Sequence, residues 1–339
     1  MNWLGGYSSE WSVYRVDVST WQDAELIDGV RSIHIERDCS DSVPLLETGT
    51  MELDASDFTE GWYRIYLTAK QEIKERVAVA TLLFQQSSKR WEKGATFLTA
   101  QGWSVLRPAA DLKLARGEFL GKGSSGVAFV VNTLSRCIPA PVVSEGDFSL
   151  DEHLVFDIGS SQLEAVWKVL EIANWCIMID GDGTVHVSEK PTEESLLLDT
   201  PGAALLIPGI GGDTDLSDKP NRYIAINGSL SATAIIEDEE SPISFQKRER
   251  WVDLVDTSPA LLAGETLQSY AQRRLTEVST RTITRTYTRE FWPGVVPYSM
   301  VKGSLPSVGL EGNLRVISQS LECGKGIVLT ETSGLEVLP

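Results

Sequence analysis

Cysteine and histidine are scarce in this chain of 339 residues, which has only four cysteines and three histidines. Cys39, Cys137, Cys176 and Cys323 lie far apart and form no Cys-x-x-Cys pair. Any zinc site would have to converge from distant parts of the chain, so we expect no metal centre. We interpret the cysteines as buried free thiols of a protein made in a reducing cytoplasm.

Long apolar runs and an excess of positive charge are also missing. No stretch of about 18 apolar residues is present, so we expect no membrane-spanning helix. The first six residues lack the basic and apolar regions of a secretory signal, and we expect none. The formal net charge is −18, which argues against a nucleic-acid clamp, because a clamp needs basic side chains to neutralise phosphates.

The negative charge is concentrated in one part of the chain. Residues 141–200 contain 13 acidic and 2 basic residues, a net charge of −11. Residues 241–300 contain 8 basic and 6 acidic residues, a net charge of +2. The simplest interpretation of the acidic region is a solvated face.

Alternating apolar and polar residues indicate strands in the first third of the chain. In residues 30–37, Ile33 and Ile35 share one face, and residues 62–68 and 76–84 alternate in the same way. Turn signals such as Asp28-Gly29 and Glu60-Gly61 separate the runs. Period-two runs with turns at short intervals are typical of an antiparallel sandwich or barrel.

Residues 109–200 are predicted to form a small α/β unit. A helix is expected at 124–136 after a Ser124 or Ser125 cap, and another at 160–175, where Ser161 and Glu164 form a capping box. Two strands then flank the Asp-Gly-Asp-Gly turn at 180–183, a strong hairpin signal. After this unit we expect a strand at 222–228, a helix at 267–278, and strands at 280–289, 313–320 and 326–332.

Three short patterns are associated with binding or catalytic sites, but their sequence context does not support such sites here. The Gly-x-Gly-x-x-Gly run at 121–126 lacks the preceding buried strand of a dinucleotide site, so we interpret it as a flexible helix start. The turn at 180–183 lacks the later ligands of a calcium loop. No Gly-x-Ser-x-Gly nucleophile elbow is present. A catalytic pair of carboxylates stays an open alternative, because the sequence does not show which acidic residues lie close together in the fold. We expect no enzyme activity, cofactor or metal.

Five segments in this order resemble the baseplate hub family, the tail-tip hub proteins of tailed bacteriophages. They are residues 11–54 (WSVYRVDVSTWQDAELIDGVRSIHIERDCSDSVPLLETGTMELD), 61–84, 161–191 (SQLEAVWKVLEIANWCIMIDGDGTVHVSEKP), 215–229 (DLSDKPNRYIAINGS) and 265–301. The resemblance implies a mainly β, α+β fold with two tail-tube-like β-barrel domains and a small α/β domain between them. The expected domains are residues 1–108, 109–200 and 201–339.

The resemblance also implies a structural role in the virion. Three chains would form a ring that adapts the hexameric tail tube to the tail tip, starts tube assembly and forms part of the DNA exit channel. The implied partners are two further copies, the tail tube protein, a distal tail or tape measure protein, and fibre or tip proteins. The alternatives are a tail-tip cell-wall hydrolase, or a carbohydrate-binding adsorption module suggested by the ten tryptophans and the β content.

An acidic wall suits a channel through which DNA slides without binding, because it repels phosphates. We therefore expect channel-facing acids within the acidic region, and the candidates are Glu145, Asp147, Asp151 and Glu152.

Overall fold

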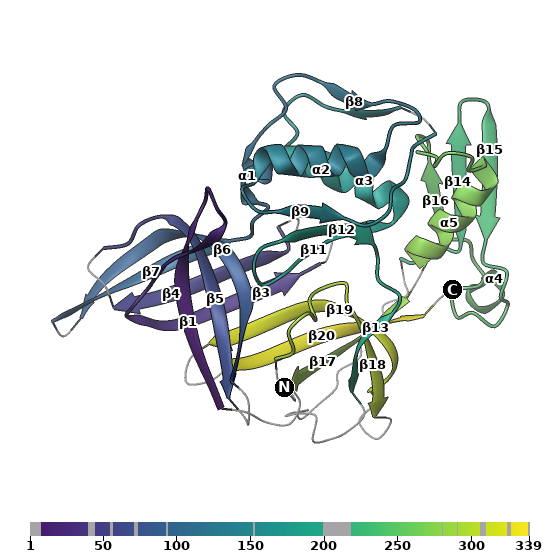
Figure 1. Ribbon diagram of the computed structural model, residues 1–339. Helices are drawn as coiled ribbons and strands as arrows, with labels where there is room; N and C mark the ends of the chain where they lie inside the picture. Colours follow the sequence, from purple (N-terminus) through teal and green to yellow (C-terminus); the bar gives the residue numbers. More distant parts are fainter. Residues whose placement is uncertain are drawn as a thin grey trace.

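Most of the chain is β-strand, gathered into one large sheet and three small ones (Figure 1). The computed structural model describes residues 8–39, 45–54, 57–70, 74–92, 94–151, 153–198, 218–279, 281–289, 291–305, 310–323 and 327–337. The large sheet has twelve strands, which are β1 (Ser8–Asp17), β2 (Gln22–Leu26), β3 (Val30–Asp38), β4 (Glu47–Asp54), β5 (Gly61–Lys70), β6 (Lys74–Glu92), β7 (Ala95–Trp103), β13 (Glu194–Leu198), β17 (Arg281–Arg289), β18 (Met300–Leu305), β19 (Leu310–Cys323) and β20 (Ile327–Val337). The prediction of a mainly β fold is confirmed.

The large sheet joins strands from distant parts of the chain. Its order is β13-β18-β19-β3-β4-β7-β6-β5-β1-β2, and β20 pairs with both β19 and β17. Strand β19 pairs with β18 along its first half and with β3 along its second half. The β13–β18 pair is parallel and the other pairs of this sheet are antiparallel. The strands predicted near residues 30, 62, 76, 281, 313 and 327 all belong to it.

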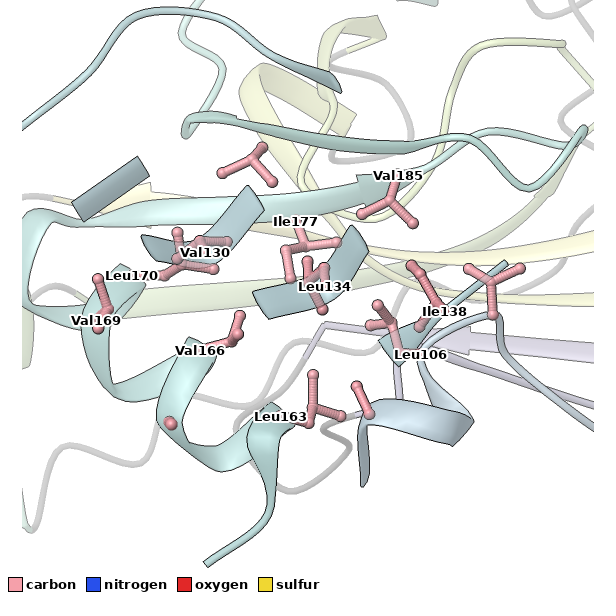
Figure 2. Close-up of a cluster of buried hydrophobic side chains, with 14 of the residues drawn as sticks. Leu106, Val130, Leu134, Ile138, Leu163, Val166, Val169, Leu170, Ile177 and Val185 are labelled. Carbon is pink, nitrogen blue, oxygen red and sulfur yellow. The ribbon is translucent and has the colours of Figure 1, made fainter. Parts of the chain in front are cut away.

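A small α/β unit lies against one end of the large sheet (Figure 1). Its helices pack between a two-stranded ribbon and a three-stranded sheet. The elements are α1 (Arg107–Asp111), β8 (Glu118–Leu120), α2 (Gly126–Cys137), β9 (Val142–Ser144), β10 (Leu154–Phe156), α3 (Gln162–Ala173), β11 (Trp175–Ile179) and β12 (Val185–Glu189). Figure 2 shows the core of this unit, where α2 and α3 contribute Val130, Leu134, Val166 and Leu170 and β11 contributes Ile177. No helix in the described segments is both long and apolar enough to cross a bilayer.

The starts of α2 and α3 follow from the sequence. The Ser125 hydroxyl accepts a hydrogen bond from the Ala128 N–H, and so caps α2. In α3 the Ser161 hydroxyl accepts from the Glu164 N–H at 3.0 Å, and the Ser161 N–H donates to Glu164 Oε2 at 2.6 Å. The predicted capping box is confirmed, and it satisfies two backbone donors that the helix leaves unpaired.

A third unit lies beside the α/β unit and has its own core. It consists of β14 (Arg222–Asn227), β15 (Leu230–Ile235), α4 (Phe245–Arg248), β16 (Asp253–Asp256) and α5 (Leu267–Ser279). Helix α5 covers one face of the sheet β15-β14-β16, where the buried Tyr223, Ala225, Ala271 and Leu275 meet. The strand and the helix predicted here are confirmed, whereas the domain boundaries stay a prediction.

A chain of buried polar side chains crosses the place where β3 meets β19. Arg37 Nε donates to Glu47 Oε1 at 2.7 Å, and Arg37 Nη1 donates to Gln319 Oε1 at 3.2 Å. Gln319 Nε2 donates to Glu331 Oε2 at 2.7 Å, and Arg289 Nη2 reaches the same oxygen at 2.5 Å. These five side chains are at most 3% exposed. Buried charges are tolerated here because each one is paired and hydrogen-bonded.

The two buried carboxyl groups of this chain differ in pKa. Burial raises the pKa of Glu47, although the Arg37 guanidinium acts in the opposite direction. Burial also acts to raise the pKa of Glu331, but Arg289 and the hydrogen bonds from Tyr287 and Gln319 outweigh it and lower that pKa. Glu331 therefore contributes stability that is present above its unfolded-state pKa and is lost as the pH falls through its folded pKa.

Replacing Arg37 by Met should lower the free energy of unfolding by about 3–5 kcal/mol, because Glu47 then becomes an unpaired buried charge. The double change Arg37→Met with Glu47→Leu should regain most of that loss. Arg31→Met serves as the control, because Arg31 forms an exposed ion pair with Asp54 and should cost about 1 kcal/mol or less. Urea unfolding at pH 7 measures all three, and equal losses for the two single changes would contradict the role of the buried pair.

Candidate interaction surfaces

The tip of the β11–β12 hairpin joins the α/β unit to the large sheet. The Asp182 carbonyl accepts hydrogen bonds from Trp21 Nε1 and from Arg64 Nη2, both at 2.9 Å. The neighbouring Gly181 carbonyl accepts one from Thr81 Oγ1 at 2.9 Å. Three side chains of the large sheet and its β1–β2 turn thus donate to this tip. Arg64 is only 5% exposed although it carries a charge.

Two glycines allow this close approach. A Cβ on Gly181 would lie 2.0 Å from the Ala78 carbonyl oxygen, so only glycine fits against β6. Gly183 has φ of +85°, a conformation that favours glycine. The predicted hairpin is confirmed, with Ile177 opposite Val187 in an antiparallel pair. Within the described segments no three His, Cys, Asp or Glu side chains come together as a metal site.

The acidic residues predicted to face a channel lie between α2 and β10, on the surface of the α/β unit. Glu145 and Asp147 are exposed and Asp151 is partly exposed, while Glu152 lies outside the described residues. Asp147 Oδ1 accepts from Ser125 Oγ at 2.6 Å and from the Phe148 N–H at 2.8 Å. Asp151 Oδ1 lies 3.1 Å from Lys122 Nζ. Two of the candidates therefore also hold local structure together.

The glycine-rich run at 121–126 has local reasons for its glycines. Gly123 has φ of +74°, and a Cβ on Gly126 would lie 2.2 Å from the Phe148 ring. The Gly126 N–H also donates to the Phe148 carbonyl at 2.7 Å. The run leads into α2, which begins at Gly126, so the predicted helix start is confirmed, whereas its flexibility stays a prediction.

The four cysteines are free thiols, of which Cys176 and Cys323 are buried and Cys39 and Cys137 partly buried. Burial raises the pKa of Cys176 to about 11 and that of Cys39 and Cys323 to about 12. These three thiols stay protonated at neutral pH, which makes them poor nucleophiles.

A groove of about 660 Å³ lies between the α/β unit and the third unit. One wall comes from β10 and α3, with His153, Val155 and Lys168, and the other from the segment 257–261 and from α5, with Tyr270 and Arg274. Sequence reasoning missed this groove, because its walls are about 100 residues apart in the chain and neither carries a recognisable motif.

Exposed apolar side chains gather on the two small units rather than on the large sheet. Of the fifteen large apolar side chains that the described residues expose most, eleven belong to the two small units, at residues 112–158 and 230–255. On the β8–β10 ribbon Phe119 and Val155 are direct cross-strand partners and are 69% and 57% exposed. Paired apolar residues of this kind on a surface mark a candidate contact with another protein.

Comparison with known proteins gives matches among solved structures. No protein-family model and no curated protein matches the sequence. The tail protein from Neisseria meningitidis MC58 is 13% identical with a TM-score of 0.70, and the match covers 97% of each chain. The 43 kDa tail protein of prophage MuSo2 from Shewanella oneidensis is 11% identical with a TM-score of 0.63, covering 96% of this chain and 98% of that one.

A third structure extends the likeness. Prophage tail protein gp18 from Listeria monocytogenes EGD-e is 7% identical with a TM-score of 0.57, and the match covers 95% of this chain and 94% of that one. At such low identities the likeness concerns the fold. This chain has the fold of these phage tail proteins along nearly its whole length.

Replacing Gly181 by Ala should loosen the α/β unit from the large sheet, because the new methyl group meets backbone of β6. Overpacking of this kind costs roughly 1–3 kcal/mol. Gly117→Ala is the matched control in the same unit, since the nearest atom there is 3.6 Å away. Amide hydrogen exchange should rise across residues 180–183 and 78–81 in the first variant only. Unchanged exchange there would contradict the importance of the close contact.

Proposed function

We propose that this chain is a structural subunit at the distal tip of a phage tail tube. The observation that carries the proposal is the likeness to solved tail proteins along nearly the whole chain. The proposed role is structural and non-catalytic, needs no cofactor, and places the protein in the virion after synthesis in the cytoplasm of a host bacterium.

In the proposed assembly three copies form a closed ring beneath the tail tube. Residues 1–108 and 201–339 each contribute a tube-like barrel, the second through β17–β20 because β14–β16 and α5 form the separate third unit. Residues 109–200 form the small domain between them. The ring then presents six similar domains to a hexameric tube. The β19–β3 pairing supports this arrangement, because it joins a strand of residues 1–108 to a strand of residues 201–339 within one chain. Closed rotational symmetry needs one repeated contact between neighbouring copies.

The proposed ring has further partners. Tail tube protein stacks on one face, and distal tail, tape measure, fibre or tip proteins bind around it. DNA passes through the hole without specific binding. The net charge of −18 supports a wall that repels phosphates, and the acidic loop with Glu145, Asp147 and Asp151 is the proposed lining.

Electron-microscopy class averages of the purified chain at high concentration test the ring. We expect closed particles with threefold symmetry and a central hole, and short tubes seeded on them when tail tube protein is added. Tail tube protein alone is the control, because it should polymerise more slowly without a seed. Monomers in both samples would contradict the proposal.

Charge reversal tests the proposed channel lining. Glu145→Lys is the cleanest change, because Asp147 and Asp151 also hold local structure. Virions assembled with Glu145→Lys should deliver DNA more slowly, since a lysine in the wall binds phosphates. Asp157→Lys, at the other end of β10, is the matched control of equal charge change. Equal delivery by both variants would count against the acidic loop as the lining.

A further inference from the structure

The groove between the two small units carries a cation without an acidic partner. Lys168 Nζ donates to the Val155 carbonyl at 3.0 Å, and none of the described carboxylates forms an ion pair with it. Arg274, on the other wall, is held by Glu277 at 2.6 Å and lies 3.5 Å from Glu171. The outer face of the ribbon adds Phe119 and Val155 beside this cation.

The third unit carries a segment of complementary chemistry. Residues 237–240 are Glu-Asp-Glu-Glu, and all four are exposed. Ile235, at the end of β15, is 40% exposed, and one buried residue, Ile236, separates it from them. Glu240 pairs with Lys247 at 2.9 Å, whereas Glu237 forms no ion pair with a described residue. The segment therefore offers one apolar side chain followed by four carboxylates.

The topology keeps the groove and this segment apart within one chain. Strands β14 and β16 are parallel, and both end near the groove, at Asn227 and just before Thr257. Strand β15 is antiparallel to β14, so Ile235 lies at the opposite end of that sheet. Six residues of strand separate the two ends by roughly 20 Å. A contact between the groove and the acidic segment is therefore favoured between copies of the chain.

We propose that the groove and the outward face of the β8–β10 ribbon receive the segment 235–240 of a second copy of this chain. Ile235 of one copy packs on Phe119 and Val155 of the next, and the carboxylates lie near Lys168. The two contacting surfaces differ, so the contact is heterologous and repeats around a ring. This inference rests on the proposed ring. The apolar part supplies affinity, while the charges set the register.

Cross-linking tests the contact directly. A chain with Val155→Cys and Ile235→Cys should form covalent trimers under mild oxidation, because each ring contact then closes one disulfide. Each single variant should stay monomeric on a denaturing gel without reductant. Val155→Cys with Thr20→Cys is the control pair, since Thr20 is exposed in the turn before β2. Threefold rings that give no cross-link would overturn this contact and leave the proposed ring standing. If neither rings nor cross-links form, both this contact and the proposed ring are contradicted.

A charge swap provides a second test. Lys168→Glu should weaken ring assembly roughly tenfold in sedimentation experiments at low salt, because it replaces attraction with repulsion. Glu237→Lys with Glu239→Lys should weaken it similarly, and combining all three changes should restore assembly. Lys74→Glu, an exposed lysine of β6, is the control of equal charge change. Additive losses without restoration would overturn the pairing of these groups.

Discussion

The large sheet depends on the hydrogen bonds of Gln319, a neutral side chain between two buried ion pairs. Its amide oxygen accepts from Arg37 and its amide nitrogen donates to Glu331. If the amide were flipped, its nitrogen would face the Arg37 guanidinium and its oxygen would face the Glu331 carboxylate. The orientation of this one side chain therefore links the two ion pairs. Because both ion pairs are buried, each depends on the hydrogen bonds of this amide to keep its polar atoms partnered.

The same sheet also serves as a platform for the α/β unit. Strand β5 is covered on both faces, with Tyr63, Ile65 and Leu67 toward the sheet core and Trp62 and Arg64 toward the small unit. The small unit presents carbonyl oxygens of a tight turn, and the sheet presents side-chain donors. Backbone acceptors on a rigid turn fix an orientation well, since they have no rotamers to lose. The acidic loop and the groove therefore take their positions from this contact.

The sequence predicts local structure well here and long-range structure poorly. Ser161 and Glu164 specify a helix start within four residues, and Asp180 to Gly183 specify a turn. Arg37 shares the face of Ile33 and Ile35 and continues the strand alternation, but beside the nearby Glu47 it also needs Gln319, which lies 282 residues away. No local pattern can report such a partner. The groove was missed for the same reason, and the acidic candidates were chosen from charge alone, which does not specify which way a loop faces.

The pairing of β3 with β19 sets an order of events during synthesis. Arg37 and Gln319 are 282 residues apart, so β3 leaves the ribosome long before its neighbour exists. At about 5–20 residues per second this interval is roughly 15–60 s. During that time β3 is an uncovered sheet edge that can pair with other chains, and contacts of such long range also slow folding. Gradual synthesis and a chaperone that shields this edge would raise the yield of native protein, whereas fast overexpression would favour aggregates.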